Sequence, residues 1–540
     1  MSIFIGTNAG DTITPELVSP GVTVIGSTKK PSAASDIILA GSGDDIVAGG
    51  AGDDLASLGA GNDTFIWKAG DGSDIVDGGS GTDRLVFGGA AGNENITLAA
   101  GPLGLARVTR DVGNVTMNLT SVERIEIAAS DGQDGITVND LSGTTVKEVL
   151  VNLAGAVNPL AGDGQADVVT VKGTEAADVI NIAPNGTSVV VSGLFASTTV
   201  DHADTMDRLL IAAGAGNDIV TAGNGLSTLT QLTIDGGTGN DTLTGGDGAD
   251  LLLGGDGNDL VNGGRGNDSA QLGSGDDTFV WNPGDGSDVV EGGTGTDTLQ
   301  FNGSNIGEDM ALSASGSHAL FTRNVAAITM DLHGMENVNV RTLGGIDNVA
   351  IGDLTGTGVK QVHVDLGAFD GTDDGAADLV SVGFTTGDDA INFNVQAGPA
   401  VINPLGGAQV FVDHQGVGDR FAIDGGAGDD SVTAHGSGGD DVIGIARDGT
   451  DSIAVFAEGG QAISLIGVEH LLVEGGAGND IITGQNGIST LTQLTIDGGA
   501  GNDTLTGGDG ADLLLGGDGN DLVNGGRGND SAQLGSGDDT

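Results

Sequence analysis

Three stretches of the chain repeat one pattern of glycine, acidic and apolar positions every nine residues. In 236–300 the words are GGTGNDTLT, GGDGADLLL, GGDGNDLVN, GGRGNDSAQ and LGSGDDTFV and, after Trp281-Asn282, PGDGSDVVE and GGTGTDTLQ. Glycine almost always takes the second and fourth places, aspartate the sixth and an apolar residue the eighth. The glycine-rich half can turn tightly, and the last three residues suit a short strand with an inward middle side chain. Because one nonapeptide buries almost nothing, the pattern predicts stacked turns around a thin shared core.

Blocks of these nonapeptides alternate with stretches of a second kind. Residues 1–34 form a leader with one degenerate repeat, and the blocks cover 35–87, 236–301 and 498–540. The stretches between them, which we call cassettes, are 88–235 and 302–497. Glycine is sparser there, and apolar residues alternate with polar ones, as in Val149, Val151 and Leu153, which is typical of strands. We expect the cassettes to continue as a parallel β-solenoid, with a small β-sandwich as the alternative.

The second half of the chain repeats the first. DLTGTGVKQVHVDL (353–366) matches DLSGTTVKEVLVNL (140–153), and residues 217–278 return almost unchanged at 479–540. The second cassette carries extra length near 434–481, which we interpret as an inserted local duplication. A solenoid accepts such an insertion because each repeat touches only its neighbours. The last nonapeptide stops at Thr540 before it is complete, which favours a fragment of a longer array.

Charge changes the picture, because a chain of 540 residues carries a formal net charge of -59. Such a chain repels nucleic acid and anionic membranes and attracts cations, and self-repulsion opposes its compaction when cations are absent. Apolar residues still make up 38% of the chain, so folding on metal binding is favoured over permanent disorder. No apolar run approaches the ~18 residues of a membrane helix, so we expect no membrane insertion. The N-terminus also lacks the pattern of a classical signal peptide.

Stacking the nonapeptides also stacks their sixth-place carboxylates, whose mutual repulsion needs protons or a cation. Hard oxygen ligands without cysteine or histidine in the motif favour calcium. The repeats resemble the RTX (repeats-in-toxin), or haemolysin-type, calcium-binding nonapeptide GGxGxDxUx. The resemblance implies an all-β fold, a parallel β-roll with two nonapeptides per turn and a calcium ion between loops about 18 residues apart. It implies the pairs Asp241 with Asp259, Asp250 with Asp268, and Asp259 with Asp277.

The predicted calcium ligands are the sixth-place aspartates of the three blocks together with glycine and third-place carbonyls. The aspartates are Asp45, Asp54, Asp63, Asp74, Asp83, Asp241, Asp250, Asp259, Asp268, Asp277, Asp288, Asp297, Asp503, Asp512, Asp521, Asp530 and Asp539. The glycines are Gly236, Gly245, Gly254, Gly263, Gly498, Gly507, Gly516 and Gly525. Asp218 and Asp480 belong to isolated nonapeptides, so they need a half-site from a cassette. Asp36 lies one period before Asp45 without the glycines and is not included.

The chain shows no enzyme motif. None of the seven histidines precedes a glutamate, so an HExxH helix is absent, as are a GxSxG elbow and a phosphate-binding GxxxxGK[ST] loop. Asp201-His202 with Asp207-Arg208 recurs as Asp413-His414 with Asp419-Arg420. This arrangement suits a general base or an exposed turn, and we favour the turn because duplication alone explains the recurrence. We therefore predict no enzymatic activity for this chain.

Each of the first two blocks contains one two-residue interruption with a tryptophan, Trp67-Lys68 and Trp281-Asn282. We interpret each tryptophan as a cap on the apolar core at a change of register.

We predict that calcium drives folding of a secreted, extracellular repeat protein with a structural or adhesive role at the cell surface or in a matrix. Its partners would be calcium ions and either surface polysaccharide or further copies of itself, with no nucleic acid. The resemblance implies type I secretion from Gram-negative cells. The alternative is the calcium-binding portion of a larger secreted enzyme, a protease, lipase or polysaccharide-modifying enzyme, with its catalytic domain outside this chain.

Overall fold

The computed structural model describes every residue except 156–159, 396–399, 405–406, 417 and 459. The chain forms two compact units, Met1–Ser274 and Gly275–Thr540. Strands dominate both units, and the described residues of each include one short 3₁₀ turn, η1 (Pro102–Gly104) in unit 1 and η2 (Val325–Ala327) in unit 2. The predicted all-β class is therefore confirmed.

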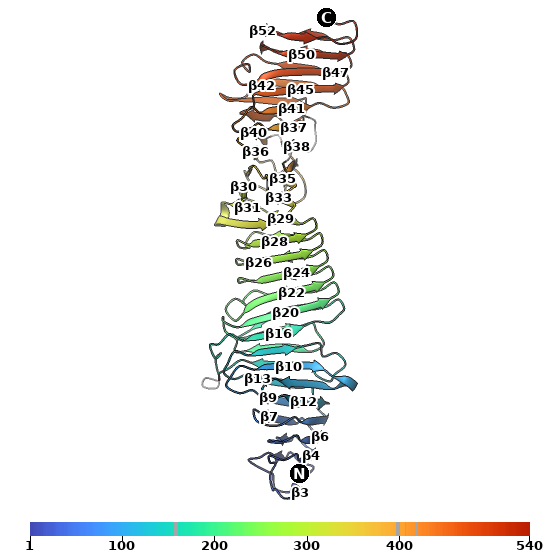
Figure 1. Cartoon of the computed structure of the whole chain (residues 1–540), viewed down its shortest axis with the longest axis vertical. Coiled ribbons are helices and arrows are strands. Elements are labelled where there is room, and N and C mark those ends of the chain that lie inside the picture. Colours follow the sequence, from blue (N-terminus) through green and yellow to red (C-terminus); the bar gives the residue numbers. More distant parts are fainter. Residues whose placement is uncertain (156–159, 396–399, 405–406, 417, 459) are drawn as a thin grey trace. The chain divides into compact units, whose positions relative to one another are not determined.

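Unit 1 consists of two sheets whose strands alternate along the chain. Sheet I contains, in spatial order, β3 (Thr23–Ile25), β1 (Ile3–Ile5), β4 (Ile37–Ser42), β6 (Leu55–Ala60), β8 (Ile75–Ser80), β12 (Val115–Thr120), β11 (Ala106–Arg110), β10 (Asn95–Ala100), β14 (Gly135–Val138), β16 (Val168–Lys172), β20 (Arg208–Ala215), β22 (Gln231–Thr238), β24 (Leu251–Asp256) and β26 (Ser269–Ser274). Sheet II contains β2 (Thr12–Ile13), β5 (Ile46–Val47), β7 (Thr64–Lys68), β9 (Arg84–Gly88), β13 (Arg124–Ala128), β15 (Glu148–Asn152), β19 (Ser197–Asp201), β18 (Ser188–Ser192), β17 (Val179–Asn185), β21 (Ile219–Ala222), β23 (Thr242–Thr244) and β25 (Leu260–Asn262). Figure 1 shows β16, β20, β22, β24 and β26 as successive rungs.

The nonapeptide period sets the register of these strands. Leu251 pairs with Ser269 and Thr242 with Leu260, so strands 18 residues apart are parallel neighbours. Each eighth-place side chain then points into the space between the two sheets. These residues, which include Val47, Ala56, Phe65, Val76, Leu85, Leu243, Leu252, Val261 and Ala270, are all at most 1% exposed. The stacked turns and the thin apolar core are as predicted.

The first cassette continues the same two sheets and adds an antiparallel meander to each. In sheet I, β8 runs parallel to β12, the strands β12, β11 and β10 form the meander, and β10 runs parallel to β14. The second meander, β17–β18–β19, lies in sheet II between β15 and β21 in the same manner. One turn of the solenoid is thereby lengthened without interrupting either sheet, so the solenoid interpretation of the cassettes is confirmed.

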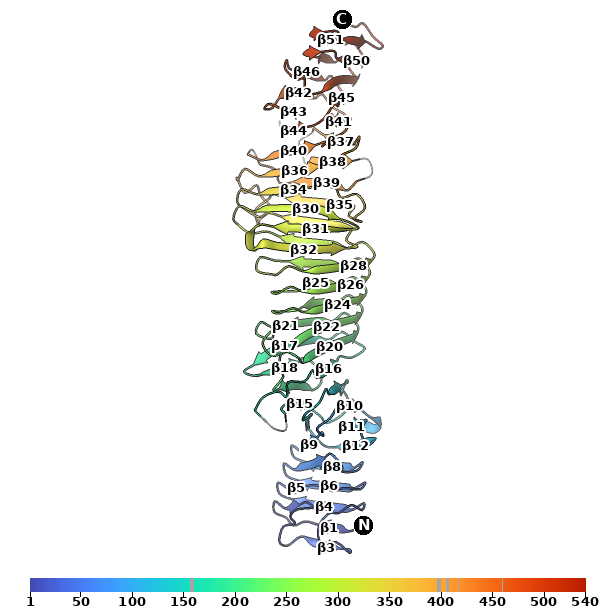
Figure 2. The same cartoon turned by 60° about the vertical axis from the view of Figure 1, so that its left-hand side comes forward.

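Unit 2 repeats this two-sheet plan. Sheet III contains β28 (Val289–Thr294), β32 (Ile328–His333), β31 (His318–Arg323), β30 (Asp309–Ser315), β34 (Asn348–Ile351), β36 (Leu379–Gly383), β40 (Arg420–Asp424), β44 (Ile463–Ile466), β43 (Ser452–Ala457), β42 (Val442–Arg447), β46 (Ile481–Gly484), β48 (Thr504–Thr506) and β51 (Leu522–Asn524). Sheet IV contains β27 (Thr278–Trp281), β29 (Thr298–Asn302), β33 (Asn337–Arg341), β35 (Gln361–Asp365), β39 (Gln409–Asp413), β38 (Ala400–Pro404), β37 (Ala390–Asn394), β41 (Ser431–His435), β45 (His470–Ala477), β47 (Gln493–Ala500), β50 (Leu513–Asp518) and β53 (Ser531–Gln533). The short strands β49 (Asp509–Gly510) and β52 (Arg527–Gly528) pair separately. Figure 2 shows β28, β32, β31 and β30 side by side.

The extra length of the second cassette is a third meander, β42–β43–β44, in sheet III. In unit 1 the chain crosses from β19 directly to β20 in the other sheet. In unit 2 it crosses to β40, back to β41 and across again to this meander before it reaches β45, whose sequence matches β20, so it crosses between the sheets three additional times. Three is an odd number, so the following strands change sheets. The segment QLTIDGG forms β22 in the sheet of the first meander of unit 1, but it forms β47 in the sheet opposite the first meander of unit 2.

The two tryptophans are fully buried at the interruptions of the nonapeptide period. Trp67 stacks on Phe87 with ring centroids 4.1 Å apart, and Trp281 stacks on Phe301 at 4.2 Å. Each indole N–H donates a hydrogen bond at 2.8 Å to a glycine carbonyl five residues later. The two-residue insertion lengthens the loop that follows the tryptophan. The buried indole fixes this loop through its hydrogen bond to the glycine carbonyl.

Candidate metal centre

The acidic residues that precede the strands form rows, which we call acid ladders. Along each row, an acid donates its backbone N–H to the side-chain carboxylate of the next acid, one turn later, until the row ends at an acid such as Asp207, whose N–H donates to the Asp204 carbonyl. Asp241 donates to Asp259 Oδ1 and Asp250 to Asp268 Oδ1, both at 2.8 Å. These two same-side pairs are thus stacked as the resemblance implied.

The second carboxylate oxygen of most ladder aspartates is buried and has no hydrogen-bond partner among the described residues. The aspartates concerned include Asp45, Asp54, Asp63, Asp74, Asp83, Asp134, Asp167, Asp218, Asp241, Asp250, Asp297, Asp347, Asp378, Asp430, Asp480, Asp503, Asp512 and Asp521. A buried acceptor without a partner is costly, and a charged one more so. A row of such oxygens is the chemical environment that a hard cation satisfies.

First-place glycines lie directly against these oxygens. A Cβ atom on Gly236 would lie 2.5 Å from Asp241 Oδ2 and 2.6 Å from the carbonyl oxygen of Gly254, one turn later. Gly498 repeats this arrangement, with corresponding distances of 2.5 Å to Asp503 Oδ2 and 2.7 Å to the Gly516 carbonyl. Carboxylate and carbonyl oxygens therefore converge on a space that any side chain would fill. The residues present fit a calcium ion, which takes ligands of both kinds.

Burial shifts the acid–base behaviour of the ladder. Desolvation raises the pKa of Asp54 to about 7 and the pKa of Asp74 and Asp250 to about 8, and neighbouring carboxylates add to the increase. The same causes raise the pKa of Asp83 and Asp297 to about 6, although backbone N–H donors oppose the increase. Without a cation, several ladder carboxyls are therefore protonated near neutral pH.

The two-residue interruptions lengthen the ladder spacing but do not break it. Asp54 donates to Asp74 Oδ1 and Asp63 to Asp83 Oδ1, both at 2.8 Å, over 20 residues. The row that contains Asp74 then meets the meander strand β12, where the Asp74 carbonyl accepts from the Asn118 N–H. Asp288 stands at the matching position beside β32 in unit 2, where its carbonyl accepts from the Asp331 N–H. Asp539 ends the chain's last pair and accepts from the Asp521 N–H at 3.1 Å.

The ladders also pass through the cassettes, which the nonapeptide pattern did not predict. The cassette members are Glu94, Glu123, Asp134, Asp167, Asp178 and Asp207 in unit 1, and Glu308, Glu336, Asp347, Asp378, Asp389, Asp419, Asp430, Asp441 and Glu469 in unit 2. Asp11 in the leader and Asp36 in the first block are further members. The available signal was an aspartate directly before an alternating strand, as in ADVVTV (166–171) and ADLVSV (377–382). Asp36, omitted from the prediction, donates to Asp54 Oδ1 and is 1% exposed.

The isolated nonapeptides obtain their second half from the cassettes. Asp178 donates to Asp218 Oδ1 at 2.7 Å, and Asp218 donates to Asp241 Oδ1 at 2.8 Å. Asp480 lies in the same way between Asp441 and Asp503, with both hydrogen bonds at 2.8 Å. Both aspartates are therefore internal members of a ladder.

Two ladder positions contain a glutamate whose charge is balanced inside the protein. Glu94 accepts from Arg110 Nε at 2.8 Å and bonds Arg110 Nη2, and Glu308 makes the same two contacts with Arg323. All four side chains are at most 5% exposed. The guanidinium carbon of Arg110 lies 5.7 Å from the Trp67 ring and that of Arg323 lies 5.2 Å from the Trp281 ring. The first meander of each unit thus supplies its own cation to the ladder.

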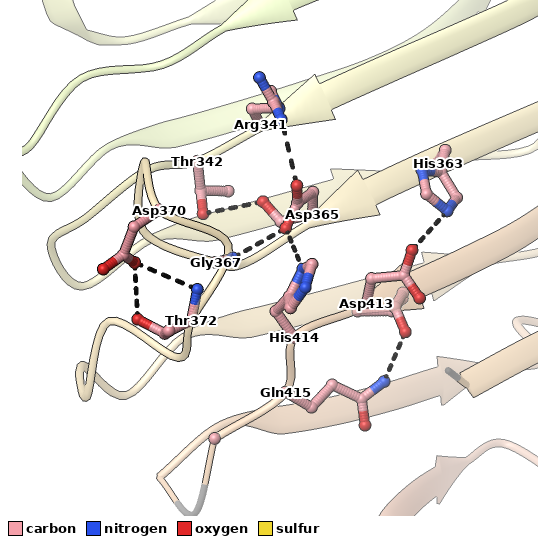
Figure 3. Close-up of polar contacts among 12 residues, drawn as sticks. Arg341, Thr342, His363, Asp365, Gly367, Asp370, Thr372, Asp413, His414 and Gln415 are labelled. Carbon is pink, nitrogen blue, oxygen red and sulfur yellow. Dashed lines mark hydrogen bonds and ion pairs between the residues drawn. The ribbon is translucent and has the colours of Figure 1, made fainter. Parts of the chain in front are cut away.

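The recurring Asp–His segments lie in turns between strands. His202 and His414 have positive φ angles of 61° and 53° directly after β19 and β39. Figure 3 shows His414 pointing to Asp365 and His363 to Asp413, with N–O distances of 2.6 and 2.7 Å. The aspartates that follow, Asp207 and Asp419, belong to the acid ladders. The contacts of His414 with Asp365 and of His363 with Asp413 therefore connect the neighbouring strands β35 and β39.

The comparisons with known proteins agree with this geometry. The family described as RTX calcium-binding nonapeptide repeat (4 copies) matches residues 32–65, 68–96, 210–229, 233–261, 253–280, 284–300, 472–491, 495–523 and 515–540. No curated protein matches the chain. Within the described residues, no helix has the length and apolar character needed to span a membrane. The matched segments fall in both units.

Proposed function

This chain is an RTX-repeat protein, and we propose that calcium ions bound along its acid ladders drive its folding outside the cell. The row of buried Oδ2 atoms without partners carries the proposal. The sixth-place aspartates listed above would supply carboxylate oxygens, and first-place glycines such as Gly254 and Gly516 would supply carbonyl oxygens. Bound calcium would provide the positive charge that lets ionised ladder carboxylates remain buried.

The ladders connect calcium binding to folding because each one is assembled only when turns stack. Asp241 and Asp259 are 18 residues apart, and the unfolded chain does not hold them together. Calcium binding to the folded state therefore stabilises that state. Extracellular calcium modules commonly have Kd near about 10⁻⁴–10⁻³ M, so the chain would stay unfolded at cytosolic calcium levels and fold after export.

The role of the folded protein is structural or adhesive in this proposal. The support is that most described residues form two stacked sheets and the loops that connect their strands. The meanders vary the outer surface at intervals without disturbing the core, which suits display toward surface polysaccharide or another copy of the chain. Glycan-array binding and analytical ultracentrifugation in calcium test these partners, and the absence of both interactions would remove this role while leaving calcium binding intact.

The decisive experiment for calcium is far-UV circular dichroism of the full chain, titrated from chelator to about 10 mM calcium, with magnesium as the control. We expect a calcium-specific transition from coil to β-structure. Intrinsic fluorescence should change together with it, because both tryptophans are fully buried only in the folded state. A spectrum that is β-rich in chelator and unchanged by calcium would exclude calcium-driven folding.

A further inference from the structure

Two histidines and an aspartate meet on the outer face of the first meander of unit 2. β31 begins at His318 and β32 ends at His333, and the pairing of Ala319 with Leu332 places these ends opposite each other. The two imidazole rings are stacked, with centroids 4.4 Å apart and an interplanar angle of 5°. Asp331 lies on the same face of β32, two residues before His333. Strand pairing alone therefore brings the three side chains together.

The three side chains converge on one atom. His333 Nε2 lies 3.2 Å from Asp331 Oδ1, and His318 Nδ1 contacts the same oxygen directly. The three potential ligand atoms all lie within 4.8 Å of one another. Their side chains are 24%, 32% and 37% exposed for His318, Asp331 and His333, so an ion from solution can reach them. Within the described part of the chain, this is the one such group of three.

We propose that His318, Asp331 and His333 form a binding site for a divalent transition-metal ion of the zinc class. Imidazole nitrogen combined with one carboxylate suits zinc, cobalt, nickel and copper, whereas calcium selects oxygen ligands. Three protein ligands leave one tetrahedral position for water or for a group from a partner. Glu291 pairs with His333 across β28 and β32, and its negative charge favours a cation at this place.

The other histidines of unit 2 show what a simple ion pair looks like in this fold. His363, His414, His435 and His470 each lie within 2.8 Å of a carboxylate oxygen. Each of those carboxylates serves one histidine. In contrast, Asp331 Oδ1 is shared by two stacked imidazoles, an arrangement that a metal ion bridging the three groups stabilises.

The fold itself does not require these histidines. In unit 1 the matching pair of the first meander is Ala106 with Leu119, which places Leu105, Asn118 and Thr120 at the three positions. That meander forms the same three strands with the same buried arginine and glutamate. The histidine cluster is therefore an addition to the second copy, and unit 1 provides the sequence of a matched control.

The test uses the full chain in saturating calcium, so that the acid ladders are filled and competing carboxylate sites are suppressed. Cobalt(II) is the first probe, because ligation by imidazole in a tetrahedral site produces visible absorption bands, and zinc is then used to displace it. We expect about one tight equivalent per chain, measured independently by isothermal titration with zinc. Magnesium should produce no heat at this site.

The decisive variant is His318→Leu combined with His333→Thr, which copies the residues of unit 1. We expect the tight equivalent to disappear, and Asp331→Asn alone to weaken it by more than about tenfold. His435→Ala, which removes a histidine paired with a single carboxylate, should leave zinc binding unchanged. Circular dichroism and the fluorescence of Trp281, which stacks on Phe301 beside Phe321 of β31, report whether the meander remains folded.

Two results would overturn the proposal. Wild-type protein that takes up no tight zinc in calcium would show that the three side chains form only a hydrogen-bonded cluster. Zinc uptake that is the same in the folded double variant would assign the metal to carboxylates elsewhere. Neither result bears on calcium-driven folding, which is measured before zinc is added.

Discussion

Glu94 and Asp250 occupy equivalent places in the acid ladder of sheet I, but their charges are balanced in different ways. Glu94 forms two hydrogen bonds with the buried guanidinium of Arg110. Asp250 has a buried Oδ2 atom with no partner among the described residues, and desolvation raises its pKa to about 8. The meander therefore carries a permanent internal cation, whereas the nonapeptide block depends on one from solution.

One solenoid can therefore combine regions with different metal requirements. Within the described residues the buried arginines are Arg110 and Arg323, and both lie in antiparallel meanders. The arginines of the nonapeptide blocks, Arg84, Arg265 and Arg527, are exposed instead. We therefore expect the first meander of each unit to tolerate calcium depletion better than the nonapeptide blocks.

The stability of the folded protein should depend on pH in opposite directions with and without calcium. In the folded state without metal, the raised pKa values of Asp54, Asp74 and Asp250 mean that folding takes up protons. That stability is fully present below about pH 4, where the carboxyls of the unfolded chain are also protonated, and it is lost as the pH rises through about 7–8. In chelator, circular dichroism should thus show more β-structure at pH 5.5 than at pH 8.5.

In calcium, the protein should instead be more stable at high pH than at low pH, because calcium displaces protons from the ladder carboxyls. The apparent calcium affinity of a ladder site should increase by up to about tenfold per pH unit below its pKa. Calcium titrations at pH 6, 7 and 8, followed by circular dichroism, measure this change. An affinity that does not vary with pH would show that the ladder carboxyls are already ionised in the protein without calcium.

Arg110→Ala should produce the largest effect of any single substitution discussed. It leaves Glu94 buried without a counter-ion, which costs about 3–5 kcal/mol of unfolding free energy. We expect urea denaturation to show this loss in saturating calcium, and Glu94→Gln in the same chain to recover part of it. Arg107→Ala on the outer face of β11 is the control. An Arg110→Ala protein that loses no stability in saturating calcium would contradict the division between internal and external cations.

Asp250→Asn should remove one calcium-linked contribution. At free calcium 100-fold above Kd, the loss of one site reduces stability by about 2.7 kcal/mol. In chelator at pH 8.5 the same substitution should be neutral or stabilising, because it removes a carboxyl that burial keeps from ionising freely. Asp77→Asn, an exposed acid outside the ladder, is the matched control. Equal effects with and without calcium would exclude Asp250 as a ligand.

His414→Asn should have the smallest effect. The His414 side chain is 40% exposed and its pairing with Asp365 lies at the surface, so the loss should be about 0–1 kcal/mol. Asparagine tolerates the positive φ of this turn, which avoids an added backbone penalty. Urea denaturation in calcium measures the effect, and a loss above this range would show that the Asp–His turn is a structural centre of the cassette.

The repeat blocks were predictable in detail because their spacing is local. The nine-residue period gives the inward position of Leu252, and the resemblance to the RTX repeats implied the stacking of Asp250 on Asp268 18 residues later. The cassette members of the ladder were not predictable in this way. Asp167 and Asp207 are 40 residues apart and become neighbours only because a complete meander is placed between them. The partners Glu94 and Arg110 meet for the same reason, across antiparallel strands.

The chain's covalent order is sufficient for the all-β class, the turn chemistry, the core positions of the blocks and the affinity for a hard cation, since each depends on neighbours within two nonapeptides. The sheet to which a segment belongs depends on the whole path before it. QLTIDGG lies in the sheet of the first meander in unit 1 and in the opposite sheet in unit 2, because three additional passes precede it there. Tertiary structure also decides that His318 and His333 converge, because strand pairing between β31 and β32 brings together residues that no local period connects.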